Sequence, residues 1–440
     1  MRSGPDRRLV RAAAAWTAAA VAAVVWPPLA GPLAGVFVLL AVLVLLDALA
    51  LGRAGPVTAR RLLPERAFVG RDTDIGLAIR NDGSAPLEVD VVDELPFDLT
   101  REESAFAALA LSPGETVEVR HPIRPAVRGD RPLGPVIVLV RSPFGLLRRR
   151  LVVPAGPPLR VYPDATRFLR PAALDPRRVM AAIGVRPARG RGEGMEFESL
   201  RDYVVGDDPR RVDWAASARR GRPVTRLYQH ERRHTVLVAL DASRLMGGRV
   251  DERTKLDHAV DAALALAYAS LVSGDRVGMV VFDQDVRAWL APRAHRRELG
   301  AFVEMLRTVT VSAVEADYRA LALALATRHR RRALLVVLTD FVEADAATLL
   351  VPLALLARQH RLLVVAMRDR VFGALEDGAA EEADPLGLYR RLVVDELLQE
   401  RESVLLRLRR AGAQTIDLVP QAITATLLNR YLALRHGPGR

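Results

Sequence analysis

Acidic and basic side chains alternate densely in one stretch of this chain, between Gly192 and Glu231. Its aspartates and arginines are Asp202, Asp207, Asp208 and Asp213, interleaved with Arg201, Arg210, Arg211 and Arg219. Carboxylates in such a cluster could serve a hydrolase or a transferase as general acids and bases. Alternating charges of this kind are more typical of a solvated surface on which the charges pair with one another.

Hydrophobic residues in the same stretch favour a structural role over a catalytic one. They are spaced so that they can be buried while the charges pair across them: Phe197, Leu200, Tyr203, Val212 and Trp214. Gly206-Asp207-Asp208-Pro209 between them is a turn signal. We therefore expect residues 166–232, here named the clasp, to pack on the domain that follows.

An alternation of apolar strands and amphipathic helices begins at His234. The expected strands are His234–Leu240, Arg276–Phe282, Ala333–Leu338, Leu362–Met367 and Thr415–Val419, and the expected helices are 254–273, 317–330, 345–359, 388–409 and 421–434. This pattern predicts a doubly wound α/β sheet, in which ligands bind at the carboxyl ends of the strands. Two of these ends carry acidic residues, because Asp241-Ala-Ser243 follows the first strand and Thr339-Asp340 follows the third.

The clasp also carries a family resemblance. The pattern G-x-E-F-x-x-L-R-x-Y-x-x-G-D-D-x-R-x-V-D-W-x-x-S-A-R resembles the signature of the domain of unknown function 58 family. The residues that match are Glu196, Phe197, Leu200, Arg201, Tyr203, Gly206, Asp207, Asp208, Arg210, Asp213, Trp214 and Arg219. The resemblance implies a membrane-anchored bacterial protein without enzymatic activity, in which the signature precedes a von Willebrand factor A-like domain. It also implies a partner, a MoxR-type AAA+ ATPase, and a role in assembling or maturing other proteins.

The same resemblance implies a degenerate metal site. Asp241, Ser243 and Asp340 match positions of the metal-ion-dependent adhesion site of von Willebrand factor A domains, which holds Mg²⁺. Two hydroxyl ligands of that site are missing, because Leu245 and Ala316 stand where a serine and a threonine are expected.

Two readings of the acidic strand ends therefore stay open. Glu315 or Asp317 could supply an oxygen in place of the missing threonine, and Mg²⁺ would then be the cofactor. Alternatively, Asp241 and Asp340 cap helix N-termini or pair with arginines, and this face is a surface for a protein partner.

Residues 57–163 have a different character. Short alternating runs at Thr73–Arg80, Pro86–Val92, Thr116–Arg120 and Pro135–Val140 are punctuated by Gly, Pro and Asn. This pattern predicts a small Ig-like β-sandwich. Ser142 precedes Pro-Phe-Gly where the family usually has aspartate, so we expect one loop contact to be missing.

No charged residue occurs between Ala12 and Leu46, and Trp26-Pro27-Pro28 interrupts the run. This predicts a transmembrane helical hairpin. Arginines flank both ends and are absent from the central turn, so the positive-inside rule places both ends, and the soluble domains, in the cytoplasm. A cleaved secretory signal peptide is the alternative, but the apolar stretch is too long for one. Asp47 is expected to reach the headgroup region.

Composition adds two exclusions. The net charge is +12, yet only one of the 64 basic residues is a lysine, Lys255, and the arginines are dispersed. This argues against a nucleic-acid site, which would need a basic platform interleaved with aromatic residues. The chain has no cysteine, which excludes disulfides and thiolate chemistry.

These observations combine into four expected regions: a transmembrane hairpin at 1–55, a β-sandwich at 56–165, the clasp at 166–232, and the α/β domain at 233–440. We expect a non-enzymatic scaffold or adaptor of the cell membrane that binds a protein partner. A hydrolase or transferase that uses the signature carboxylates is the alternative.

Overall fold

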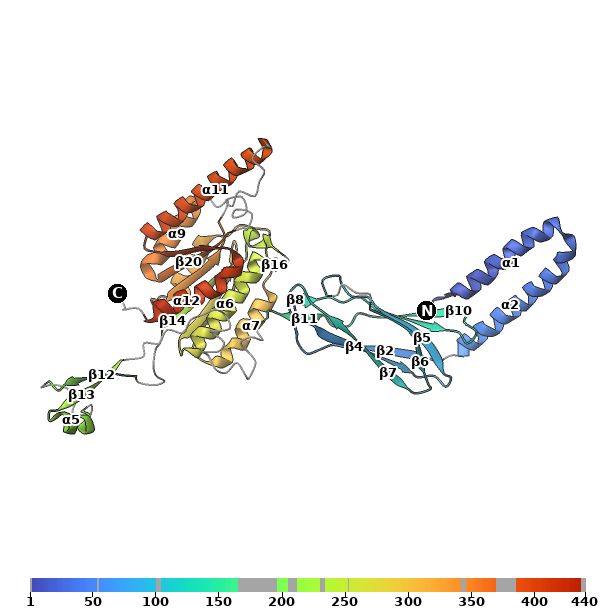
Figure 1. The fold of residues 1–440 in the computed structure, drawn as a ribbon, viewed down its shortest axis with the longest axis horizontal. Helices are drawn as coiled ribbons and strands as arrows, with labels where there is room; N and C mark the ends of the chain where they lie inside the picture. Colours follow the sequence, from blue (N-terminus) through green and yellow to red (C-terminus); the bar gives the residue numbers. More distant parts are fainter. Residues whose placement is uncertain are drawn as a thin grey trace. The chain divides into compact units, whose positions relative to one another are not determined.

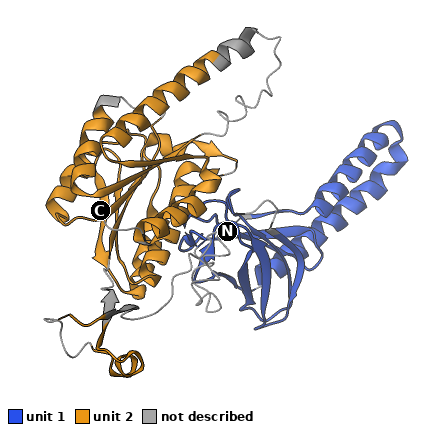
Figure 2. Ribbon diagram, turned by 60° about the vertical axis from the view of Figure 1, so that its left-hand side comes forward, with its two compact units in different colours: residues 1–164 blue, residues 165–440 orange. Residues whose placement is uncertain are grey.

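The computed structural model describes residues 2–53, 55–99, 104–164, 196–204, 212–229, 234–251, 253–341, 346–368 and 385–436. The chain divides into two compact units, Met1–Asp164 and Ala165–Arg440, which Figure 2 distinguishes by colour.

A helical hairpin begins the first unit (Figure 1). Helix α1 (Arg7–Val25) and helix α2 (Ala30–Arg53) are joined by a short 3-10 turn, η1 (Pro27–Leu29). Both helices are long and apolar enough to cross a membrane. They also contact each other, because the Trp16 indole donates a hydrogen bond to the Leu33 carbonyl at 3.0 Å. The predicted break at Trp26-Pro27-Pro28 is confirmed.

Three sheets follow in the same unit. The five-stranded sheet has the order β1-β10-β9-β5-β6, and the two three-stranded sheets have the orders β2-β4-β7 and β3-β11-β8. The strands are β1 (Arg2–Pro5), β2 (Val57–Leu62), β3 (Ala67–Phe68), β4 (Thr73–Asn81), β5 (Leu87–Asp93), β6 (Ser104–Leu111), β7 (Thr116–Ile123), β8 (Gly129–Arg131), β9 (Val136–Arg141), β10 (Leu147–Val153) and β11 (Leu159–Tyr162). The four strands expected from the sequence are present as β4, β5, β7 and β9.

Alternate residues of the β2-β4-β7 sheet and the five-stranded sheet fill a shared core. Leu77 and Ile79 of β4 pack with Val89 and Val91 of β5 and with the inward residues of β9. The β2-β4-β7 sheet and the five-stranded sheet therefore bury their apolar faces together. This is the packing that period-two alternation requires of two stacked sheets.

The chain is tied to β10 of the five-stranded sheet before the helical hairpin through β1, and after the hairpin through the Gly55 carbonyl, which accepts from Arg149 at 2.9 Å. Strand β1, which precedes α1, pairs antiparallel with β10, and the Arg148 guanidinium binds the Asp6 carboxylate, with Nε 2.5 Å from Oδ2. Strand β1 was not expected from the sequence, because Arg-Ser-Gly-Pro has no strand pattern. As a consequence, both ends of the hairpin lie at the same part of the unit.

Asp47 of α2 is buried against the loop between β9 and β10. Its carboxylate accepts hydrogen bonds from the Phe144 and Leu146 amides, at 2.9 and 3.0 Å, and from the Ser142 hydroxyl. Two expectations are therefore corrected. Asp47 binds this loop instead of reaching toward headgroups, and Ser142 supplies the loop contact that was expected to be missing.

The second unit contains a six-stranded sheet with the order β18-β17-β14-β19-β20-β21. Its strands are β14 (Thr235–Asp241), β17 (Arg276–Phe282), β18 (Val286–Arg293), β19 (Leu334–Thr339), β20 (Arg361–Met367) and β21 (Gln414–Leu418). Only β18, at one edge, is antiparallel to its neighbour. All five strands expected from the sequence are confirmed within two residues at each end, and β18 was missed.

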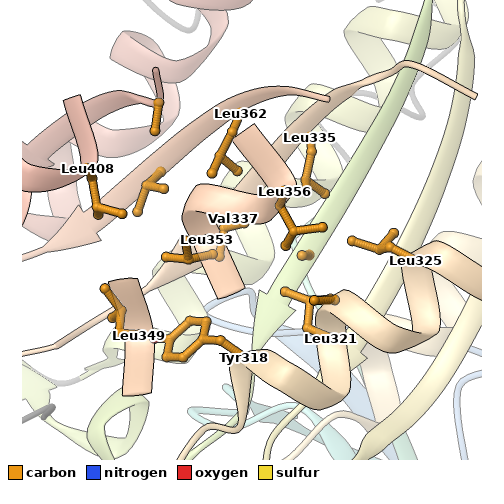
Figure 3. Packing of buried hydrophobic residues seen from close by; sticks show 14 of the residues in the cluster. Tyr318, Leu321, Leu325, Leu335, Val337, Leu349, Leu353, Leu356, Leu362 and Leu408 are labelled. Carbon is orange, nitrogen blue, oxygen red and sulfur yellow. The ribbon is translucent and has the colours of Figure 1, made fainter. Parts of the chain in front are cut away.

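Helices connect these strands. They are α6 (Lys255–Val272), α7 (Leu299–Thr308), α8 (Tyr318–Arg328), α9 (Ala346–Gln359), α11 (Pro385–Arg410) and α12 (Ile423–His436). Helices α8, α9 and α11 bury leucines against one face of the sheet, while α6 packs on β14 and β17 beside α7 and α12. Figure 3 shows the first of these cores, in which Tyr318 and Leu321 of α8 meet Leu349 and Leu353 of α9. The five expected helices are confirmed and α7 was missed.

Candidate functional site

The acidic strand ends meet, as expected, at one edge of the α/β sheet. Asp241 is the last residue of β14, and Thr339 is the last residue of β19, the adjacent parallel strand. Asp340 follows directly. Parallel neighbours end at the same edge, so their terminal side chains come together. The Asp241, Thr339 and Asp340 side chains are all buried there.

Asp241 is held by neutral donors. Its Oδ2 accepts from the Thr339 hydroxyl at 2.5 Å, and its Oδ1 accepts from the Ser243 amide at 2.8 Å. The Tyr318 hydroxyl lies 2.7 Å from Thr339 Oγ1. Because Thr339 gives its one proton to Asp241, Tyr318 is the donor to Thr339. Burial raises the pKa of Asp241 to about 6, although the hydrogen bonds from Thr339 and Ser243 oppose that rise.

Asp340, by contrast, is paired with two cations. Its Oδ2 lies 2.5 Å from Lys255 Nζ, and its Oδ1 lies 2.7 Å from Arg401 Nη1. The Phe341 amide donates to the same Oδ1 at 2.8 Å. The Lys255 and Asp340 side chains are 3% and 0% exposed, so this pair has been transferred out of water. A buried carboxylate requires such partners to stay ionised.

Arg401 connects Asp340 to β21, the edge strand of the sheet. It projects from α11, binds Asp340, and donates Nε and Nη2 to Asp417 Oδ1 of β21 at 3.1 and 2.9 Å. Its guanidinium lies 4.9 Å from the centroid of the Phe341 ring. Burial disfavours its charge, but the two carboxylates outweigh burial and raise the pKa of Arg401. Two carboxylates and two cations thus balance in one network, which is buried except at Asp417, where the side chain is 21% exposed. We name it the Asp340 network.

Local structure positions Lys255 within it. Thr254 caps α6, in a capping box with Asp257, so Lys255 is the first residue of the helix and its amide donates to the Gly248 carbonyl at 2.8 Å. The side chain runs across Gly248, where an added Cβ would lie 3.1 Å from Lys255 Cε. Glycine at this position therefore leaves the space that the lysine stem occupies.

A divalent cation does not fit this arrangement. A Mg²⁺ ion about 2.1 Å from Asp340 Oδ2 would lie within about 4.6 Å of the Lys255 ammonium. The repulsion between these charges is about 7 kcal/mol at an effective dielectric constant of 20. Among the residues that the structure describes, no group of three or more His, Cys, Asp or Glu side chains is placed to hold a metal ion.

The substituted ligand positions agree with this result. Leu245 lies in the 3-10 turn η4 (Arg244–Gly247), and Ala316 packs against the hydrophobic core. Asp317 caps α8 by accepting from the Arg319 amide at 2.7 Å, so it acts as a helix cap. Glu315 is 83% exposed and pairs with Arg244, Nη2 to Oε1, at 3.6 Å. Arg244 and Glu315 form an exposed ion pair beside the buried network, here named the rim pair.

The clasp forms a small motif of its own. Strands β12 (Glu196–Asp202) and β13 (Val224–Gln229) pair antiparallel, and the short helix α5 (Trp214–Arg220) precedes β13. Asp213 caps α5 by accepting from the Ala216 amide at 3.0 Å, and the Ser217 hydroxyl donates to the Asp213 carbonyl at 2.7 Å. Asp213 therefore has a structural role in the described structure.

The exposure of Trp214 contradicts the expectation that it is buried. Its side chain is 71% exposed, and Tyr203 is half-buried. Arg219 donates Nε to the Ala215 carbonyl within its own helix at 3.2 Å. Gly206, Asp207, Asp208 and Arg210, and the side chains of Glu196, Phe197, Leu200 and Arg201, lie outside the described residues.

Comparison with known families tests the resemblance. The model of the family described as "Protein of unknown function DUF58" matches residues 199–393, from the clasp to the first half of α11. The chain carries a DUF58 region.

The relatives that the chain matches are themselves uncharacterised proteins. Proteins of Mycobacterium bovis and Mycobacterium tuberculosis are 28% identical to it over 221 residues, which is 49% of this chain. The match spans 63% of the length of these relatives.

Solved structures add no argument about the fold. A CARDB domain from Pyrococcus furiosus aligns with 22% of the chain and 86% of its own length, at 12% identity and a TM-score of 0.16. Proximal thread matrix protein 1 of the mussel byssus aligns with 46% of the chain and 47% of its own length, at 12% identity and a TM-score of 0.30.

Several key residues of this site were missed from the sequence. Lys255 was noted only as the single lysine of the chain, and Arg401, Tyr318 and Asp417 were not singled out. One signal was available for Lys255: a lone lysine among 64 basic residues is an exception to an arginine-only composition. No comparable signal distinguishes Arg401 from the other arginines of α11.

Proposed function

We propose that this DUF58 protein is a membrane-anchored, non-catalytic adaptor that binds a protein partner at the carboxyl edge of its α/β sheet. One observation carries the proposal: the carboxylates at this edge are buried and committed to internal contacts. Asp340 is neutralised by Lys255 and Arg401, and Asp241 accepts from Thr339 and Ser243. Carboxylates with such internal partners stabilise the edge of the sheet as a surface for binding.

Catalysis would need different properties at the same place. A general acid or base must reach the substrate within hydrogen-bond distance, and its proton must be free to move. The Asp241 and Asp340 side chains are both buried, and Asp340 is charge-paired. In the clasp, Asp213 caps α5, and Asp202 pairs with Arg222 on the surface at 2.8 Å. These contacts support a binding role over the hydrolase or transferase alternative.

We further propose that α1 and α2 form a two-span hairpin in the cell membrane, with the soluble domains in the cytoplasm. The pairing of β1 with β10 supports the hairpin, because residues before α1 and after α2 then lie on the same side of the membrane. The flanking arginines favour the cytoplasmic side. The signal-peptide alternative is disfavoured, since cleavage would remove β1 from the sheet.

The proposal includes the types of the two soluble domains. The stacked sheets of the first unit support an Ig-like sandwich. The order β18-β17-β14-β19-β20-β21, with Asp241 at the end of β14 and Asp340 directly after β19, supports a von Willebrand factor A-like domain. For the partner we propose a MoxR-type AAA+ ATPase, which the family resemblance suggests. The rim pair, Arg244 and Glu315, is the exposed charged feature beside the buried network that such a partner would contact.

The proposal is tested by measuring a binding affinity. The purified full-length protein is placed in lipid nanodiscs, and its binding to the MoxR-type ATPase of the same genome is measured. We expect Arg244→Glu to weaken binding about five- to tenfold, or about 1–1.4 kcal/mol, without changing the melting temperature. The swap Arg244→Glu/Glu315→Arg restores the internal pair but keeps the surface charges reversed, so it should also bind weakly. Arg330→Glu, an exposed change before β19 at the opposite edge, is the matched control. Binding that is unaffected by all three variants would remove the rim pair from the interface, and no binding by the unmodified protein would remove the partner.

A further inference from the structure

Lys255 occupies the position of a cation. Its ammonium lies 2.5 Å from Asp340 Oδ2, at the edge where the family resemblance implies that Asp241, Ser243 and Asp340 stand at ligand positions of a divalent metal site. Burial is nearly complete, since Lys255 and Asp340 are only 2% and 1% exposed when backbone and side chain are taken together. An ammonium is a compact point charge with three donors, so it can satisfy oxygen atoms that would otherwise face a metal ion.

We propose that the Lys255 ammonium is a resident cation that replaces the divalent metal at this edge, and that its removal converts the edge into a divalent-cation site. The second part follows from charge balance. With Lys255 present, two cations match Asp340 and Asp417 in the network. Without it, the network carries an unbalanced negative charge. A further carboxylate lies at the same edge, because the Thr339 hydroxyl that donates to Asp241 is 3.3 Å from the Asp340 carbonyl.

The surrounding geometry leaves room for the exchange. Gly248 has no side chain where the lysine stem passes, so shortening the stem opens space beside Asp340. The remaining oxygen ligands are carboxylates and hydroxyls, which hard divalent cations prefer, and water can complete the coordination sphere. This inference concerns the buried site alone and stands whether or not the edge binds a protein.

Mn²⁺ is a suitable probe because its free and bound forms can be counted by electron paramagnetic resonance. The full-length protein in detergent would be titrated over the range of about 10⁻⁴–10⁻³ M that weak oxygen sites require. We expect no specific Mn²⁺ on the unmodified protein and one equivalent on Lys255→Ala. Lys255→Met fills the space without a charge and is the matched control, in which no ion should bind. The double variant Lys255→Ala/Asp340→Asn should lose the site.

Two results would overturn the proposal. One equivalent of Mn²⁺ on the unmodified protein that is lost in Asp340→Asn would show that the edge is a metal site despite the lysine. A folded Lys255→Ala that binds no Mn²⁺ would show that the ammonium does not stand in a cation position. Should Lys255→Ala not fold, the unmodified protein still provides a test, because its melting temperature should be the same in EDTA and in millimolar Mg²⁺. A higher melting temperature in Mg²⁺ would contradict the proposal.

Discussion

Replacing Lys255 by methionine removes the ammonium from the Asp340 network and keeps a flexible side chain of similar length. Asp340 then retains Arg401 and the Phe341 amide but loses the contact at Oδ2. Removing one partner of a buried ion pair costs about 3–5 kcal/mol, because the other charge stays buried without compensation. Since Arg401 still neutralises part of that charge, we expect the lower end of this range, about 3 kcal/mol.

Hydrogen exchange monitored by mass spectrometry measures this loss in the relevant domain of the full-length protein. Peptides from β14 and β19 report the opening free energy of the central sheet, whatever the stability of the first unit. Arg244→Met is the matched control, because it removes a cation from an exposed pair, which contributes about 0–1 kcal/mol. If Lys255→Met and Arg244→Met change the exchange of these strands equally, by less than about 1 kcal/mol, the buried ion pair does not hold the edge together.

Three further changes test other contacts. Asp241→Asn should remove a pH dependence of the unfolding free energy. Burial raises the pKa of Asp241 from 3.8 to about 6. The stabilising contribution of this carboxyl group is therefore complete below pH 3.8 and is lost as the pH rises through 6. The unfolding free energy of the unmodified protein should thus fall by about 3 kcal/mol relative to Asp241→Asn between pH 4 and 7, and parallel pH profiles would contradict this. Asp47→Leu should speed hydrogen exchange of the Phe144 and Leu146 amides at least tenfold, and unchanged exchange would refute the loop contact. Trp214→Ala should change the unfolding free energy by less than about 1 kcal/mol, whereas a loss of about 3–5 kcal/mol in thermal melts would mean that the ring is buried.

Strong periodicity made much of the α/β domain predictable. Runs such as Arg276–Phe282 are apolar after their first residue because both faces of a parallel strand are covered, and the sequence boundaries of this strand agree with β17. Strand β18 lies at the edge, mixes Arg287 and Pro292 with apolar residues, and pairs antiparallel. Its sequence therefore lacks the pattern that identified the other strands.

The site was predictable only in part. The hydrophobic pattern places each residue within its own strand or helix, but it does not predict which side chains of different elements are in contact. Parallel strand order brings Asp241 and Asp340 to one edge, and this was expected. The contact between Lys255 and Asp340 joins the start of α6 to the end of β19, and no local rule predicts it. The prediction that Trp214 is buried was wrong for another reason. Asp213 and Ser217 satisfy hydrogen bonds within the clasp, so the spacing of its hydrophobic residues did not require the Trp214 ring to be buried.

Photo-crosslinking in native membranes tests the adaptor role most directly. A photoreactive phenylalanine analogue at position 244, beside the buried network, is compared with the same analogue at position 330, at the opposite edge of the sheet. We predict that position 244 gives a crosslink to a MoxR-type AAA+ ATPase and that position 330 does not. Crosslinks to the ATPase from position 330 alone would move the contact to the other edge. The absence of this ATPase from the products of both positions would contradict the proposed function.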